Sequence, residues 1–199
     1  CLDANTSGNN NTAVGQNALG ANTTASDNVA VGTAAGDAIT TGGQNVAIGA
    51  GALGAVTTTT GNVAIGYNAL DASATGTQNC VAIGTSALGA LTASGSGTTP
   101  SIGIGYNALA GATSGTNNIA IGAWTMDAVV TGVSNVALGN SALTAVTSGG
   151  SNTAIGQSAG DALVDGSNNT IIGKDADAAA TNTSNSVTLG NGSISALRC

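Results

Sequence analysis

Aspartates are the only carboxylates of this 199-residue chain, and nothing else in it is better suited to bind a metal ion. Four of the nine lie close together near the C-terminal end: Asp161, Asp165, Asp175 and Asp177. Calcium is held by several converging oxygen ligands, so these four could bind it loosely. Alternatively they are solvated turn residues. We favour solvated turns and therefore expect no metal site and no cofactor.

Groups that carry acid–base and nucleophilic catalysis are scarce. The chain has neither His nor Glu, and its only bases are Lys174 and Arg198. General acid–base catalysis relies mostly on His, carboxylates and tuned Lys side chains. We therefore expect no enzymatic activity. A formal net charge of −7 also lacks the basic footprint that nucleic acids need, so we expect no nucleic-acid partner.

Three cysteines complete the reactive groups: Cys1, Cys80 and Cys199. An odd number in a secreted protein suggests pairing between chains or a free thiol. No CxxC or Cys/His cluster indicates metal ligation. Cys1 and Cys199 lie at opposite ends of the sequence and could form a disulfide between subunits. The alternatives are that both are free thiols, or that Cys1 is a mature N-terminal residue that carries a lipid.

The rest of the composition is small and uncharged, with 32 Gly, 38 Ala, 28 Thr and 22 Asn. Collagen is excluded because Gly does not recur at every third position and Pro100 is the only proline. Disorder is not indicated either, since β-branched apolar residues are frequent and charges are few. No apolar run is long enough to cross a bilayer, so we expect no membrane span.

An internal repeat organises these residues. The motif Asn45-Val-Ala-Ile-Gly49 recurs along the whole chain, and eight of the ten intervals between its closing glycines are 17 residues. Repeats should be sought before anything else, because they decide the fold. The closing glycines are Gly15, Gly32, Gly49, Gly66, Gly84, Gly105, Gly122, Gly139, Gly156, Gly173 and Gly190.

A 17-residue unit is too short for a two-helix repeat, and short Val/Ile runs bounded by Gly and Asn indicate strands and turns. The sequence therefore predicts an all-β fold, a parallel β-solenoid (β-roll) of about eleven 17-residue coils stacked about 4.8 Å apart. We expect a single repeat array over 1–199. The long interval before Gly105 predicts a polar bulge at 93–100 between coils.

An Asn precedes most of the predicted strands. Stacked in register, these side chains are expected to form an amide ladder, each bonded to its neighbour. Cys80 stands where this column should carry an Asn. The predicted ladder consists of Asn11, Asn28, Asn45, Asn62, Asn118, Asn135, Asn152 and Asn169.

Both faces of the predicted strands are apolar. In Val46-Ala47-Ile48 the outer residues face one side and Ala47 the other, yet neither side is polar. Such a strand is expected to be buried on both sides, and Ala permits close approach across the roll or from another subunit. We predict a parallel homotrimer. The alternative is a monomeric solenoid with a thin, Ala-packed interior.

The aromatic residues gather within about three coils of the bulge. Tyr67, Tyr106 and Trp124 each follow shortly after a predicted strand. Because interfaces are enriched in Tyr and Trp, these three are the best candidate for a contact patch. The alternative is that they are isolated side chains covering turns.

The motif Asn-Val-Ala-Ile-Gly, followed by Ala-Leu and a Thr/Gly turn, resembles the head repeats of trimeric autotransporter adhesins. The longer stretch Asn-Thr-Ala-Val-Gly-Gln-Asn-Ala-Leu at 11–19 also resembles repeats of tail-fibre-like proteins. The resemblance spans almost the whole chain and implies a β-roll with three chains per fibre. The 17-residue unit is longer than the usual adhesin head repeat.

Our main hypothesis is an extracellular or cell-surface fibre component, a self-assembling shaft or adhesive head. Its expected partners are further copies, as a homotrimer or stacked end to end because the repeat starts and stops mid-coil, and a cell surface or glycan. A second hypothesis is a phage-type tail fibre segment that recognises host surfaces. A third is an ice-binding β-solenoid, although its Thr columns break at Ala74, Val130 and Val164.

Overall fold

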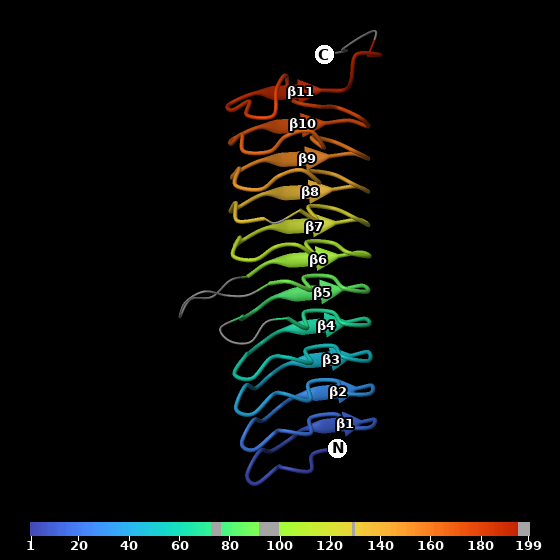
Figure 1. Ribbon diagram of the computed structural model, residues 1–199, viewed down its shortest axis with the longest axis vertical. Coiled ribbons are helices and arrows are strands. Elements are labelled where there is room, and N and C mark those ends of the chain that lie inside the picture. The colour runs from blue at the N-terminus through green and yellow to red at the C-terminus, as the bar shows by residue number, and fades with distance from the viewer. Residues whose placement is uncertain (73–76, 92–99, 129, 195–199) are drawn as a thin grey trace.

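A computed structural model describes residues 1–72, 77–91, 100–128 and 130–194, and it is a parallel β-solenoid (Figure 1). The predicted all-β solenoid fold is confirmed: about ten turns link eleven strands of three residues, which form one sheet in chain order. No helix in these ranges could span a bilayer. The strands are β1 Thr12–Val14, β2 Val29–Val31, β3 Val46–Ile48, β4 Val63–Ile65, β5 Val81–Ile83, β6 Ile102–Ile104, β7 Ile119–Ile121, β8 Val136–Leu138, β9 Thr153–Ile155, β10 Thr170–Ile172 and β11 Val187–Leu189.

Every strand pairs with the next in the same register, so like residues stack on like. Val46 pairs with Val63, and the register also holds across the longest interval, where Val81 of β5 pairs with Ile102 of β6. The longer interval therefore leaves the strand register unchanged. The predicted bulge at 93–100 lies, apart from Pro100, outside the described residues.

The glycine that closes each strand is required by its backbone. The first ten closing glycines have φ between +126° and +137°, a region that L side chains rarely adopt. Adjacent coils also approach too closely for a side chain here: a Cβ on Gly139 would lie 2.4 Å from the carbonyl oxygen of Gly156. The motif therefore ends in Gly for reasons of conformation and of space.

Each of the first nine corners then turns through two left-handed residues, two and four positions after the closing glycine. The first is mostly Asn or Ser, and Asn in particular tolerates this conformation. The second is mostly Leu, such as Leu53 and Leu143, with φ of 53° and 52°. These Leu side chains are fully buried, so burial offsets the backbone strain.

The interior is one thin apolar column. In the coil around β3 it is filled by Ala47 of the strand, by Ala52 and Leu53 of the corner, and by Val56 of the following segment, all buried. Of the two options that the sequence leaves open for the strand Ala, the structure shows packing across the roll. The outward residues of the strands are thus left on the surface.

Candidate functional site

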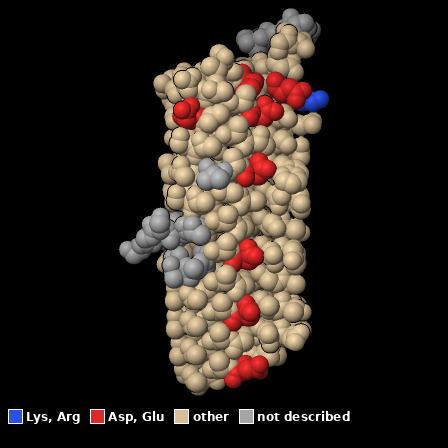
Figure 2. Space-filling model, in the orientation of Figure 1, with Lys and Arg blue, Asp and Glu red and all other residues tan. Residues whose placement is uncertain are grey.

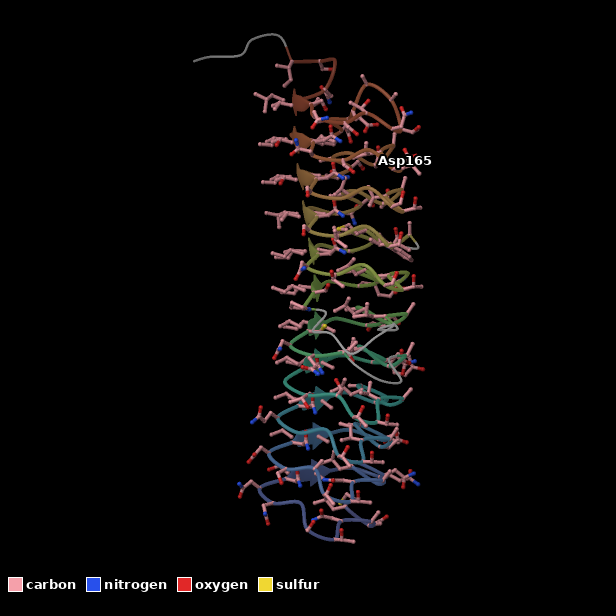
Figure 3. All side chains as sticks on the ribbon, turned by 90° about the vertical axis from the view of Figure 1, so that its left-hand side faces the viewer. Asp165 is labelled. Atoms are coloured by element: carbon pink, nitrogen blue, oxygen red, sulfur yellow. The ribbon has the colours of Figure 1, made fainter. Side chains whose placement is uncertain are left out.

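The main surface feature is the outer strand face, formed by the first and third residues of each strand. Side chains on this face project away from the rest of the coil, to the left of the strands in Figure 3. Eight of the third residues are 37–57% exposed, and three (Ile65, Ile83 and Ile104) are half-buried. The first residues are Thr12, Val29, Val46, Val63, Val81, Ile102, Ile119, Val136, Thr153, Thr170 and Val187, and the third are Val14, Val31, Ile48, Ile65, Ile83, Ile104, Ile121, Leu138, Ile155, Ile172 and Leu189.

Such a face is unusual on a soluble monomer. Monomers rarely expose contiguous apolar patches larger than a few hundred Å². Here Val, Ile and Leu continue along eleven strands stacked about 4.8 Å apart. Parallel sheets, moreover, are normally covered on both faces. The outer strand face therefore has the composition of a surface that another molecule covers.

Beside most of the strands, on the inner side, runs a ladder of Asn side chains. Asn28 Oδ1 accepts hydrogen bonds from both the backbone nitrogen and Nδ2 of Asn45, each at 3.0 Å. Asn45 Nδ2 also donates to the carbonyl oxygen of Thr59 at 3.0 Å. The same side-chain bond joins Asn11 to Asn28, Asn45 to Asn62, and in a second run the members Asn118, Asn135, Asn152 and Asn169.

Between those two runs the ladder changes chemistry. Cys80 is buried; its nitrogen donates to Asn62 Oδ1 at 2.8 Å, and its Sγ donates to the carbonyl oxygen of Gln78 at 3.8 Å. The next position is Ser101, whose Oγ accepts from the Asn118 nitrogen at 3.4 Å. A shallow apolar depression of about 290 Å³ lies at this interruption, where Pro100 enters β6.

The three aromatic side chains lie on the edge that follows the strands, and we call them the aromatic edge: Tyr67, Tyr106 and Trp124. They are 59%, 48% and 43% exposed. Tyr106 and Trp124 meet edge to face, with ring centroids 4.9 Å apart at 79°. Tyr67 is not part of this pair. It lies two coils earlier, with Thr85 at the equivalent position between.

Trp124 occupies a backbone position that suits it poorly. It is the second residue after its closing glycine and has φ of 58°. The left-handed region costs an ordinary side chain about 1–2 kcal/mol. Unlike the corner Leu residues, Trp124 is not buried in compensation. Its counterparts are smaller: Asn17, Ala34, Gly51, Asn68, Ser86, Asn107, Ser141, Ser158 and Asp175.

The four C-terminal aspartates do not gather into one site. Asp165, labelled in Figure 3, lies on the side away from the strands, and Asp175 forms an ion pair with Lys174 at 3.7 Å. Burial raises the pKa of Asp177, and the charge of Asp161 adds to this. Throughout the described ranges, no three His, Cys, Asp or Glu residues form a cluster that could hold a metal ion.

Four aspartates, one of them the C-terminal Asp161, lie five residues after a closing glycine in coils that are never adjacent: Asp37, Asp71, Asp127 and Asp161. Figure 2 shows acidic side chains spread in a line along the rod. Partial burial raises the pKa of Asp71 and of Asp127. Spacing by two coils or more keeps these like charges apart, which stacking on adjacent coils would not.

Of the two terminal cysteines, Cys1 lies within the described residues. Cys1 is exposed, and the N-terminal ammonium pairs with Asp3 at 3.2 Å. Cys199 lies outside the described residues, so the predicted intersubunit disulfide stays a prediction.

Threonine hydroxyls are used within the rod. Those of Thr6, Thr23 and Thr40 donate to the carbonyl oxygens of the next coil at 2.8, 3.0 and 3.1 Å. They are therefore committed to bonds between coils. The predicted break at Ala74 lies outside the described residues.

Comparison with known proteins adds no relative: no family model, no curated protein and no solved structure matches this chain.

Proposed function

We propose that this chain is a shaft segment of an extracellular fibre, in which copies associate in parallel through their outer strand faces as a homotrimer. The observation that carries the proposal is the exposed Val/Ile face, which continues along all eleven strands. Burying it between chains removes apolar side chains from water, the dominant favourable term in association.

Further copies of the same chain fit this face best. The columns repeat at every coil, so a partner must carry the same spacing to match them over their whole length. Copies related by rotation about a shared axis that runs parallel to the rods place equivalent residues together and form a closed assembly. The described first and third strand residues carry no charge, so no oppositely charged partner is required. That the assembly contains three chains is proposed from the resemblance to adhesin heads.

The interior of the rod supports a mechanical role for the chain. Backbone bonds join every coil to the next, stacked amide bonds join most of them, and each strand contacts only its neighbours. Bases are nearly absent, with Lys174 and Arg198 the only ones, which is unusual for a cytosolic protein. A rigid, weakly charged rod serves as a spacer that holds a binding surface away from its anchor.

A phage-type tail fibre segment is the second candidate. The aromatic edge favours it, because exposed aromatic side chains suit recognition of a surface. Ice binding gains no such support, since the Thr6, Thr23 and Thr40 hydroxyls are already bonded to carbonyl oxygens.

Immunogold labelling of intact source cells and of particles released from them tests the proposal. An antibody raised against the purified chain should decorate surface filaments without permeabilisation. Labelling confined to the tails of virions would favour the second candidate. Labelling that requires permeabilised cells, with none on any particle, would contradict both.

A further inference from the structure

We infer that the aromatic edge, Tyr67, Tyr106 and Trp124, binds a neutral carbohydrate chain that runs along the rod. This goes beyond the proposed shaft, which needs no ligand, and it does not depend on how many chains the fibre contains. Three observations carry it: the rings are not needed for the core, the backbone beneath them is fixed by hydrogen bonds between coils, and the first two positions after each closing glycine in these coils carry no charge.

The core of these coils is complete without the rings. Leu70, Leu109 and Met126 fill the corner positions of the same three coils and are fully buried. The rings lie outside this core, about half exposed. Trp124 also keeps a left-handed backbone that Asn107, in the coil before, adopts at lower cost. Strain without a packing gain is typical of residues kept for function.

The backbone beneath the rings is fixed before any ligand arrives. The nitrogen of Trp124 donates to the carbonyl oxygen of Tyr106, and that of Ser86 to Tyr67, each at 2.9 Å. Tyr106 and Trp124 also hold each other edge to face. A surface that is already ordered loses little conformational entropy on binding, which favours affinity.

The chemistry around the rings is that of hydroxyl and amide groups. The first and second positions after the closing glycines carry no charge until Lys174 and Asp175. Near the rings they hold Asn68, Thr85 and Asn107. A sugar ring presents an apolar C–H face, which the electron-rich face of an aromatic ring attracts. Its hydroxyl groups bond to amides and hydroxyls of this kind.

Charged polymers fit this edge less well. Bases of single-stranded nucleic acids also stack on aromatic side chains, but those sites combine stacking with Lys and Arg along the backbone. Sulfated or uronic polysaccharides would likewise need cations, and the edge has none between Tyr67 and Trp124. The composition therefore selects an uncharged ligand.

The arrangement favours a linear ligand. Tyr67, Thr85, Tyr106 and Trp124 belong to four successive coils. Three steps of about 4.8 Å extend over about 14 Å along the rod. A chain of several sugar units would reach from Tyr67 to Trp124, whereas a single sugar would contact one ring or the pair.

Trp124 is the only tryptophan, so its fluorescence reports on this edge alone. We would titrate the purified chain with cellohexaose, chitohexaose and laminarihexaose, and with heparin as the charged comparison. A saturable change with at least one neutral hexasaccharide, and none with heparin, is expected. No response to any neutral hexasaccharide, or a response to heparin alone, would overturn the inference.

Substitutions taken from other coils give variants that should fold. Tyr106→Thr introduces the residue found at Thr33 and Thr85, and it leaves the Trp124 reporter in place. Removing a central aromatic contact should weaken binding about tenfold or more. Val133→Ala truncates an exposed apolar side chain outside the edge and should leave the affinity unchanged.

A second variant removes the strained ring. Trp124→Asn restores the Asn found at Asn17 and Asn107, so its thermal unfolding midpoint should not fall. In affinity electrophoresis through a gel containing a soluble neutral glucan that binds the parent chain, retardation should disappear. If Tyr106→Thr and Trp124→Asn changed the oligomeric mass but not sugar binding, the edge would be a contact between chains, and the inference would be wrong. A monomeric parent that still binds sugar would contradict only the proposed fibre.

Discussion

The two faces of the same strands differ in the opposite sense to most proteins. Inward positions are small, mostly Ala, and are buried almost completely in β2 to β9. Outward positions are larger, mostly Val, Ile and Leu, and many remain more than a third exposed. The thin coil limits the volume inside, whereas nothing within the chain limits the outside. We infer that the inner face determines the fold of one chain, and that the outer face suits contact with other chains.

The strongest test of the inner side concerns its amide ladder. Asn135→Ala removes bonds to Asn118 and Gly149 and two bonds accepted from Asn152, all buried. Each buried polar group left unpaired costs about 1–3 kcal/mol, so the free energy of unfolding should fall by about 3 kcal/mol or more. Urea denaturation measures it. Asn140→Ala, which removes two exposed bonds, serves as the control and should stay within about 0.5 kcal/mol of the parent. Equal losses would contradict the inner–outer distinction.

Inner volume gives the next largest effect. Ala154→Ile adds bulk to a filled interior and should cost about 1–3 kcal/mol. Nature shows the compensation one coil later. Inward Ile171 coexists with Gly160 at a corner position where most coils have Leu, and a Cβ on Gly160 would lie 3.0 Å from Ile171. Adding Leu143→Gly to Ala154→Ile should therefore recover part of the loss.

The control for this test adds the same bulk outside the core. Ala55→Ile, at an exposed turn position, should change the free energy of unfolding little. A single Ala154→Ile variant as stable as the parent would show that the interior is not filled.

The smallest effect on stability is expected from Asp71 and Asp127, two of the aspartates that lie five residues after a closing glycine. Burial raises the pKa of Asp71 and Asp127, so the folded chain binds these protons more tightly than the unfolded chain. Their contribution is present below the ordinary pKa of a carboxyl group and is lost as pH rises through the raised value. Asp71→Asn with Asp127→Asn should flatten this acid-range decline, measured by urea midpoints at a series of pH values. If the parent's free energy of unfolding rose with pH through this range and the double variant abolished that rise, the upward direction of the two pKa shifts would be wrong.

The sequence predicts the fold well because its period is nearly invariant. Each three-residue run before a closing glycine is a strand, including Ile102–Ile104 after the long interval. Which strand face points inward could not be predicted, because polar–apolar alternation assigns faces and both faces here are apolar. The left-handed Leu positions were equally hidden, since Leu is not a residue that normally signals that conformation.

The candidate site could be predicted only in part. Trp124 and Tyr106 are 18 residues apart, and one 17-residue period brings them to adjacent coils and nearly the same column. The exposure of the outer strand face could not be predicted, because it follows from the burial of the strand Ala residues inside the coil. No periodicity shows what covers a surface, because a monomer and a trimer share the same columns.

Sedimentation equilibrium of the purified chain tests the central claim, that other copies cover the outer strand face. We expect a mass three times the chain's 18.4 kDa over a wide concentration range. Leu138→Lys, which places a charge on that face, should reduce it to one chain, and Ser148→Lys, at an exposed turn, should not. A parent chain that sediments as a single chain at all concentrations would contradict the account.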